Sequence, residues 1–197
     1  SWDSFAGYYE LDPANVSTER AVNIARLSYD IQLGRALNVL PFVEGDYSVY
    51  EDRLVDEDGE ERFGVTGGVT FQSRLQRTMP GIGPYQRLKH IVIPSVTYIY
   101  RPDPSGDPSK IPQLDGLDFR PGRERVEGKI ENVLLAKHAE TGDVWQLAHL
   151  AIYAGSDFES EIGTSDDFEV DFSFRPVPKW GLFASAEHHD AEAGGGV

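Results

Sequence analysis

Apolar and polar residues alternate with a period of two through much of the chain, as they do in β-strands that have two different faces. In the first such run the apolar positions are Ala25, Leu27, Tyr29, Ile31 and Leu33, with polar residues between them. Similar runs cover residues 39–50, 63–72, 88–100, 132–138, 144–158, 168–175 and 180–187. The pattern predicts an all-β chain of about eight or nine antiparallel strands, joined mainly as up-and-down hairpins.

Turn-forming residues separate these runs. Asp58-Gly59 is a strong hairpin signal. Five prolines between residues 101 and about 128 predict a long exposed loop, because proline cannot donate to a β-ladder. Pro94 lies inside the 88–100 run and predicts a bulge or a local irregularity. The best helix candidate, residues 17–25, has a poor 3.6-residue pattern.

Two architectures fit this period: an outer-membrane β-barrel, or a soluble sandwich or lipocalin-like barrel. Several runs reach the roughly 9–11 residues that a tilted membrane-spanning strand needs. Aromatic residues near the run ends and charges on the polar sides suit an interfacial girdle and a water-filled lumen. The run 168–175 distinguishes the two architectures, because Phe168, Val170, Phe172 and Phe174 face lipid in a membrane barrel and fill a closed core in a sandwich.

Composition narrows the possible functions. The 197 residues suit one β domain, and the net charge of −15, from 33 acidic and 18 basic residues, disfavours nucleic-acid binding. The chain has no cysteine, which excludes disulfides and thiolate sites within it. No apolar stretch approaches the roughly 20 residues of a transmembrane helix.

The candidate chemical motifs are weak. His188 and His189 are adjacent, so on a strand they point to opposite faces and cannot chelate together. His138 and His149 fall in one predicted hairpin and could be cross-strand neighbours, but a third zinc ligand is missing. The acidic run 56–61 lacks the full calcium-loop pattern, and no Gly-x-Ser-x-Gly motif occurs. The sequence therefore predicts no enzyme activity and no catalytic, cofactor or metal site.

The run 88–100, followed by a Pro-rich loop, resembles the C-terminal barrel domain of the LptD (organic-solvent-tolerance) family. The family's strand reads His, two residues, Glu-Pro and then an alternating run that ends in aromatics. His90 and Pro94 match this strand, whereas Ile93 stands where the acidic residue is usual. The family's loop motif, (Ile/Leu)-Pro-x-(Phe/Leu)-Asp, is matched by Ile111, Pro112, Leu114 and Asp115. We take these six matching positions as structural markers of the family.

The resemblance extends over most of residues 25–187 and implies a function. Members of this family insert lipopolysaccharide into the outer leaflet of the outer membrane. It implies as partners lipopolysaccharide, a plug lipoprotein in the lumen, the periplasmic lipopolysaccharide-transport bridge and outer-membrane lipid. The family's N-terminal periplasmic domain has no counterpart in residues 1–197, so we expect an internal segment of a larger barrel or a shortened relative.

Two other functions remain open from the sequence. The first is a soluble or surface-exposed β-sandwich or barrel that binds glycan or protein. The second is a generic diffusion porin, in which the 101–128 loop would constrict the lumen.

Overall fold

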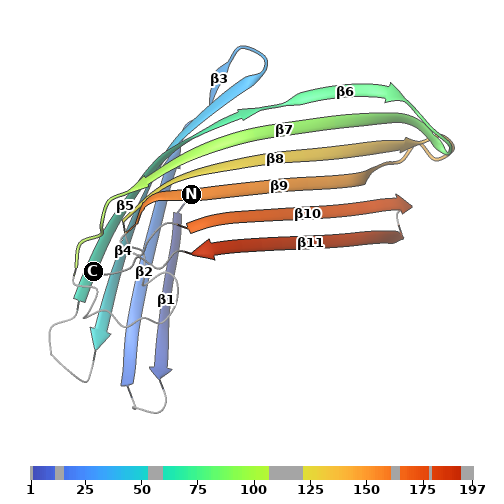
Figure 1. The fold of residues 1–197 in the computed structure, drawn as a ribbon. Helices are drawn as coiled ribbons and strands as arrows, with labels where there is room; N and C mark the ends of the chain where they lie inside the picture. The colour runs from blue at the N-terminus through green and yellow to red at the C-terminus, as the bar shows by residue number, and fades with distance from the viewer. Residues whose placement is uncertain are drawn as a thin grey trace.

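A computed structural model describes residues 2–11, 16–52, 60–106, 122–160, 165–177 and 179–191. Every strand in these ranges belongs to one antiparallel sheet, and the ranges contain no helix (Figure 1). The strands are β1 (Trp2–Leu11), β2 (Val16–Ser28), β3 (Ile31–Leu33), β4 (Leu37–Asp52), β5 (Glu60–Ser73), β6 (Leu75–Pro80), β7 (Tyr85–Arg101), β8 (Arg123–His138), β9 (Val144–Ser160), β10 (Ser165–Val177) and β11 (Trp180–Ala191).

The eleven strands form a nine-strand meander with two short continuations. The path runs β1-β2-β4-β5-β7-β8-β9-β10-β11, while β3 pairs only with β4 and β6 only with β7. β2 and β3 keep the same register on β4, and β5 and β6 keep the same register on β7. The up-and-down all-β prediction is confirmed, and the expected eight or nine strands correspond to this path.

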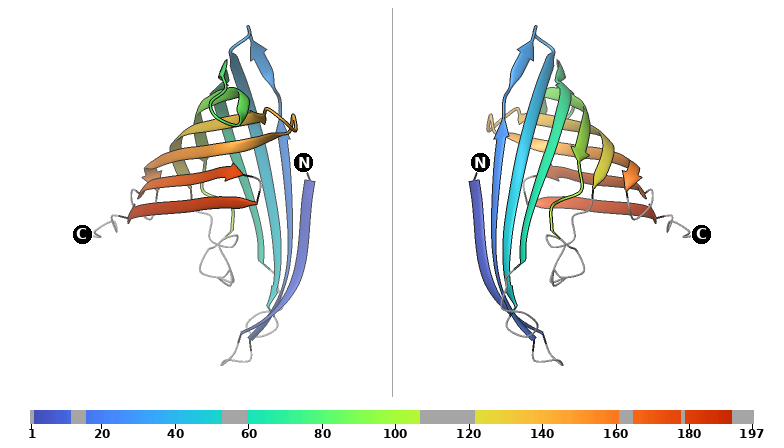
Figure 2. Two further views of the ribbon diagram at one scale, coloured as in Figure 1. Left: turned by 90° about the vertical axis from the view of Figure 1, so that its right-hand side faces the viewer. Right: turned by 90° about the vertical axis from the view of Figure 1, so that its left-hand side faces the viewer.

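The sheet is bent and open rather than closed into a barrel. β1, β2, β4 and β5 run in a clearly different direction from β8 to β11, and the long strand β7 curves between the two groups (Figures 1 and 2). β1 and β11 are the two edges of the sheet. The barrel part of the predicted fold is therefore not seen in the described residues.

Pro94 marks the irregularity that the sequence predicts, but the break lies in the neighbouring strand. β7 continues through Pro94, which pairs with Ile130 of β8. On the other side, the ladder with β5 ends at Gln72↔Ser95 and the ladder with β6 begins at Leu75↔Val92. Because proline has no N–H to donate, the ladder is interrupted opposite it, and β5 and β6 are two elements rather than one.

Several predicted boundaries were wrong. Residues 17–25, the best helix candidate, lie within β2, and residues 18–28 of that strand pair in register with β4. The predicted 101–128 loop is too long at both ends: Arg101 ends β7, and β8 begins at Arg123. Residues 102–106 are irregular as expected, and Ser105 donates its backbone N–H to Phe63 O over 2.9 Å. β1 is a strand that the alternation did not predict.

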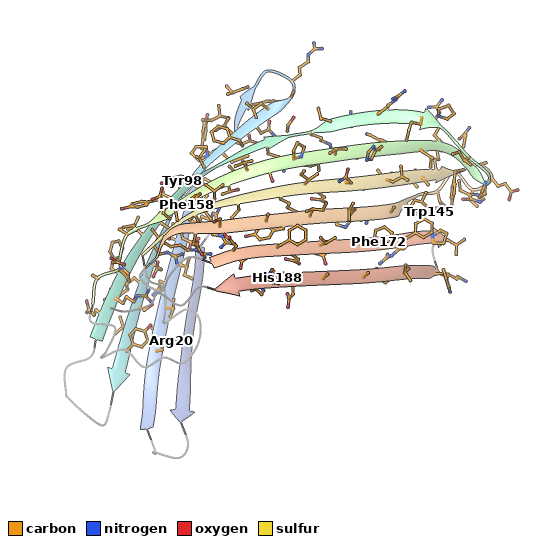
Figure 3. The ribbon with its side chains drawn as sticks, in the orientation of Figure 1. Arg20, Tyr98, Trp145, Phe158, Phe172 and His188 are labelled. Carbon is orange, nitrogen blue, oxygen red and sulfur yellow. The ribbon has the colours of Figure 1, made fainter. Side chains whose placement is uncertain are left out.

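Side chains divide the sheet into two faces. Cross-strand partners such as Tyr47↔Phe63, Tyr98↔Val126 and Phe168↔Ala154 lie on one side, which we call the apolar face. Partners such as Ile99↔Arg125 and Asp171↔Ala151 lie on the other, which we call the polar face. In Figure 3, Tyr98 and Phe158 project from the outside of the bend, so the apolar face is the convex one.

The 168–175 run follows the predicted division. Phe168, Val170, Phe172 and Phe174 lie on the apolar face, and Glu169, Asp171 and Ser173 lie on the polar face. The three phenylalanines keep 46%, 36% and 37% of their surface exposed. No second sheet among the described strands covers them. They do not fill a closed core.

A small hydrophobic cluster lies near the short turns 81–84 and 139–143. Buried Leu88, Ala136 and Leu147 pack there against Met79 and Leu134, and Tyr85 also belongs to the cluster. Next to this cluster, the Trp145 indole donates to Arg175 O over 3.2 Å, and the Tyr85 hydroxyl donates to Pro176 O over 2.5 Å. These bonds connect the end of β10, where the register shifts, to β7 and β9.

Candidate functional site: the charged network of the polar face

The polar face carries its buried charges near the ends of the strands opposite the 81–84 and 139–143 turns. Arg20, Asp46 and Arg62 on β2, β4 and β5 are each less than 5% exposed, as is Arg125 on β8. Burying ions is costly unless they are paired and hydrogen-bonded. The hydrogen bonds of Arg125 show how the desolvation cost of a buried charge is offset.

Arg125 is bonded to side chains from three strands. Its Nε donates to Glu127 Oε1 over 2.9 Å, its Nη1 to Asp157 Oδ2 over 3.2 Å, and its Nη2 to the Tyr153 hydroxyl over 2.7 Å. Nη2 also donates to Asp167 Oδ2 on β10. The planar guanidinium suits such a fork of acceptors. Arg125 therefore connects β8 to β9 and β10.

Two neighbours extend this network. Arg123 makes a bidentate pair with Asp157, with Nε 2.5 Å from Oδ1 and Nη2 3.1 Å from Oδ2. Asp167 bonds on its other side to His189 of β11, with Oδ1 2.8 Å from Nδ1. The network, Arg123, Arg125, Asp157, Asp167 and His189, therefore spans β8 to β11.

Glycines on the polar face leave room for these large side chains. A Cβ at Gly155 would overlap the Arg125 guanidinium, one at Gly64 would overlap the Asp46 carboxylate, and one at Gly68 would overlap the Phe42 ring. Above Phe42 lies Arg26, whose Cζ is 4.0 Å from the ring centroid. Gly64 and Gly68 are therefore positions of close approach within the 63–72 run, where any larger residue would collide with its neighbour.

The charges of Asp167 and His189 stabilise each other. Burial raises the pKa of Asp167, but the hydrogen bonds from His189 and Arg125 outweigh it, and the pKa lies below its usual value. The hydrogen bond to Asp167 raises the pKa of His189. Both residues lie near strand ends, beyond the uncharged stretches of the apolar face at 168–174 and 182–188.

The histidines and the family-marker positions are dispersed. His188 and His189 face opposite sides, as predicted, because they pair with Phe168 and Asp167 respectively. His138 and His149, which the sequence allowed as cross-strand neighbours, are not opposite each other: His138 is opposite Tyr85, and His149 is opposite Val133. No group of three or more possible metal ligands occurs among the described residues.

Of the family-marker positions, His90 and Pro94 lie on the apolar face of β7, where they pair with Leu134 and Ile130. Ile111, Pro112, Leu114, Asp115 and the acidic run 56–59 lie outside the described residues. The Arg125 network was not predicted. The sequence signal for it is the recurrence of charged residues at alternate strand positions, Arg123, Arg125 and Glu127, but it does not identify their partners.

Comparison with known proteins gives no assignment. No family model, no curated protein and no solved structure matches this chain. Among the described residues, no helix could span a membrane.

Substitution of Gly155 tests the packing of the network. We expect Gly155→Ala to displace the Arg125 guanidinium from its acceptors and to lower the free energy of unfolding by about 1–3 kcal/mol. Gly128→Ala is the matched control, because its Cβ would meet only Ala154 O, at 3.9 Å. Denaturant titration measures both variants. Equal effects of the two substitutions would show that Arg125 needs no such space.

The Asp167–His189 pair predicts a pH dependence. The part of the free energy of unfolding that comes from His189 is fully present below the pKa of His189 in the unfolded chain, about 6.5. It is lost as pH rises through the raised pKa of His189 in the folded protein. Through Asp167, stabilisation is present above about pH 4 and is lost as pH falls through the lowered folded pKa. We expect His189→Gln to flatten the loss of stability between about pH 6 and pH 9, and His188→Gln to leave it unchanged. Denaturant titration at about pH 6 and pH 9 measures the free energy of unfolding of each variant. If this free energy falls as much with pH in His189→Gln as in the wild type, the pairing is contradicted.

Proposed function

We propose that this chain forms part of the wall of an outer-membrane β-barrel that inserts lipopolysaccharide into the outer leaflet. Its apolar face would contact lipid, and its polar face would line a water-filled lumen. The observation that carries the proposal is the separation of exposed apolar side chains from charges on the two faces of one sheet.

The apolar face supports contact with lipid. On it, the stretches 39–49, 63–71, 88–100, 126–136, 148–156, 168–174 and 182–188 carry no Asp, Glu, Lys or Arg. Large side chains there stay exposed, including Val43 at 45%, Phe71 at 46%, Val96 at 50% and Ile130 at 47%. Five of these seven stretches reach the roughly 9–11 residues that a tilted strand needs to cross a bilayer. Monomeric soluble proteins rarely expose so large a continuous apolar surface.

Six exposed aromatic residues of the apolar face lie near one level of the sheet, whereas Phe71, Phe172 and Phe174 lie away from it. The six lie close to the strand ends that adjoin the long 102–122 connection. They are Tyr47, Phe63, Tyr98, Tyr100, Phe158 and Phe168, each between 37% and 57% exposed. A row of aromatic side chains at this height is what an interfacial girdle of a membrane barrel provides.

The polar face supports a hydrated lumen. Lys129 and Glu131 on β8 and Glu187 on β11 carry charge there, with 49%, 30% and 73% of their side-chain surface exposed. On a lipid-facing surface, a cation at the bilayer midplane costs about 2–4 kcal/mol. The geometry therefore favours lipid on the convex side and water on the concave side.

The lipopolysaccharide-inserting role rests on the family resemblance of His90, Pro94 and the 111–115 motif. A plug lipoprotein and a periplasmic transport bridge are the partners that this role requires. A diffusion porin shares the same two-faced sheet and is the second candidate, favoured by the exposed carboxylates of the polar face.

Cysteine labelling tests the orientation of the two faces, because the chain has no cysteine of its own. We expect Phe172→Cys in lipid vesicles to resist a water-soluble maleimide and to react with a lipid-soluble one. Asp171→Cys, the neighbouring residue on the polar face, is the matched control and should react readily. Equal labelling of both positions would contradict the membrane proposal.

Photo-crosslinking in cells tests the transported molecule. A photoreactive residue at Thr97, on the polar face of β7, should form an adduct with lipopolysaccharide. The same residue at Glu140, in the exposed turn 139–143, should form none. Ion conductance by the purified chain without any lipopolysaccharide adduct at Thr97 would favour the porin instead.

A further inference from the structure

Basic side chains gather at the end of the sheet that carries the short turns 81–84 and 139–143 and the link between β10 and β11. We call this group the basic rim; it comprises Arg77, Arg87, Lys89, Lys137, Arg175 and Lys179. Five of the six are exposed, and Lys89 is half-buried. Adjacent strands bring them together: Arg87 is opposite Pro80 on β6 and Lys137 on β8. The Trp145–Arg175 hydrogen bond holds the end of β10 beside them.

The basic rim and the arginines at the opposite end of the sheet differ in whether they form ion pairs with carboxylates. Within the described part of the chain, none of the rim's six cations forms an ion pair, whereas Arg123 and Arg125 are both paired with carboxylates. The acidic residues in the adjoining turn are Glu140 and Asp143. This end is therefore net positive in a chain whose net charge is −15.

The basic rim also adjoins exposed apolar side chains. Ile82 in the first turn is 74% exposed, and Trp180 and Leu182 at the start of β11 are 66% and 56% exposed. Trp180 directly follows Lys179. Tryptophan together with Lys and Arg beside an apolar surface is the combination found where proteins meet lipid headgroups.

We propose that the basic rim binds the phosphate groups of anionic phospholipid headgroups. The inference rests on the proposed membrane function and adds to it the lipid class recognised at one end of the sheet. One Arg guanidinium can donate two hydrogen bonds to two oxygens of the same phosphate, and the Lys ammonium group adds a localised positive charge. Because no carboxylate among the described residues forms an ion pair with these side chains, their positive field is available to the membrane surface. Binding there would fix the depth of the sheet and the direction in which it faces.

Flotation with vesicles tests the proposal on the full chain. Vesicles of phosphatidylcholine alone are compared with vesicles of phosphatidylcholine mixed with phosphatidylglycerol. The test variant combines Arg87→Gln, Lys137→Gln and Lys179→Gln, which are three exposed positions beside three different turns. We expect the wild type to prefer the anionic vesicles and the variant to lose that preference by on the order of 100-fold. Added salt should weaken the wild-type preference.

The matched control removes the same charge away from the basic rim, with Arg26→Gln, Arg74→Gln and Lys129→Gln. We expect it to keep the preference for anionic vesicles. Equal loss in the control would overturn the proposal, because net charge alone would then explain the binding. Equal wild-type binding to both vesicles would also overturn it while leaving the proposed function intact. Failure to bind either vesicle would instead contradict the proposed function.

Discussion

Backbone pairing in one sheet, with side chains alternating between its faces, is the constraint on which the other features depend. Neighbouring residues such as Asp171 and Phe172 must point to opposite sides of the sheet. The alternating sequence therefore sends most charges of the central strand segments to the concave side. On the convex side the stretches 39–49, 88–100 and 168–174 carry no charged residue, and Arg77 lies there opposite His90. A shift of one residue in any register would reverse this assignment and place charge on the apolar face.

The same constraint accounts for the network on the concave side. Charges directed inward at the bend lose water, so they are stable only when they pair with one another. Arg125 meets this requirement by binding Asp157 on β9 and Asp167 on β10, and Asp167 in turn binds His189 on β11. The lack of a side chain at Gly155 makes this arrangement possible. On the basic rim, where the side chains are mostly solvent-exposed, no such pairing is required.

The direction of the strands also limits how the sheet can be completed. Because the meander contains nine strands, its two edges β1 and β11 run in the same direction. Direct pairing of these edges would be parallel, unlike every other pair in the sheet. In lipid, exposed backbone groups at an edge cost several kcal/mol each, so the proposed membrane location requires further strands to pair with these edges.

Period-two alternation was sufficient to predict most strands and both faces of the 168–175 run. It was not sufficient for β1 or for residues 17–25, where apolar and polar residues do not alternate regularly in the sequence. The Arg125 network could not be predicted, because its partners lie 28 to 42 residues away along the chain, apart from Glu127. Sequence alternation identifies the face of a residue but not its neighbours across the sheet. The bend of the sheet could not be predicted from alternation either, because the twist of a sheet accumulates over many strands.

The most direct test of the central claim is paramagnetic relaxation of residues 88–100 in lipid nanodiscs. A lipid-borne nitroxide should broaden the side-chain signals of Val92, Val96 and Tyr98, while a water-soluble gadolinium chelate should broaden those of Ile93, Thr97 and Ile99. Such an alternation with a period of two is the result expected for a sheet with lipid on its convex face and water on its concave face. Uniform broadening of all six residues by the water-soluble agent would contradict it.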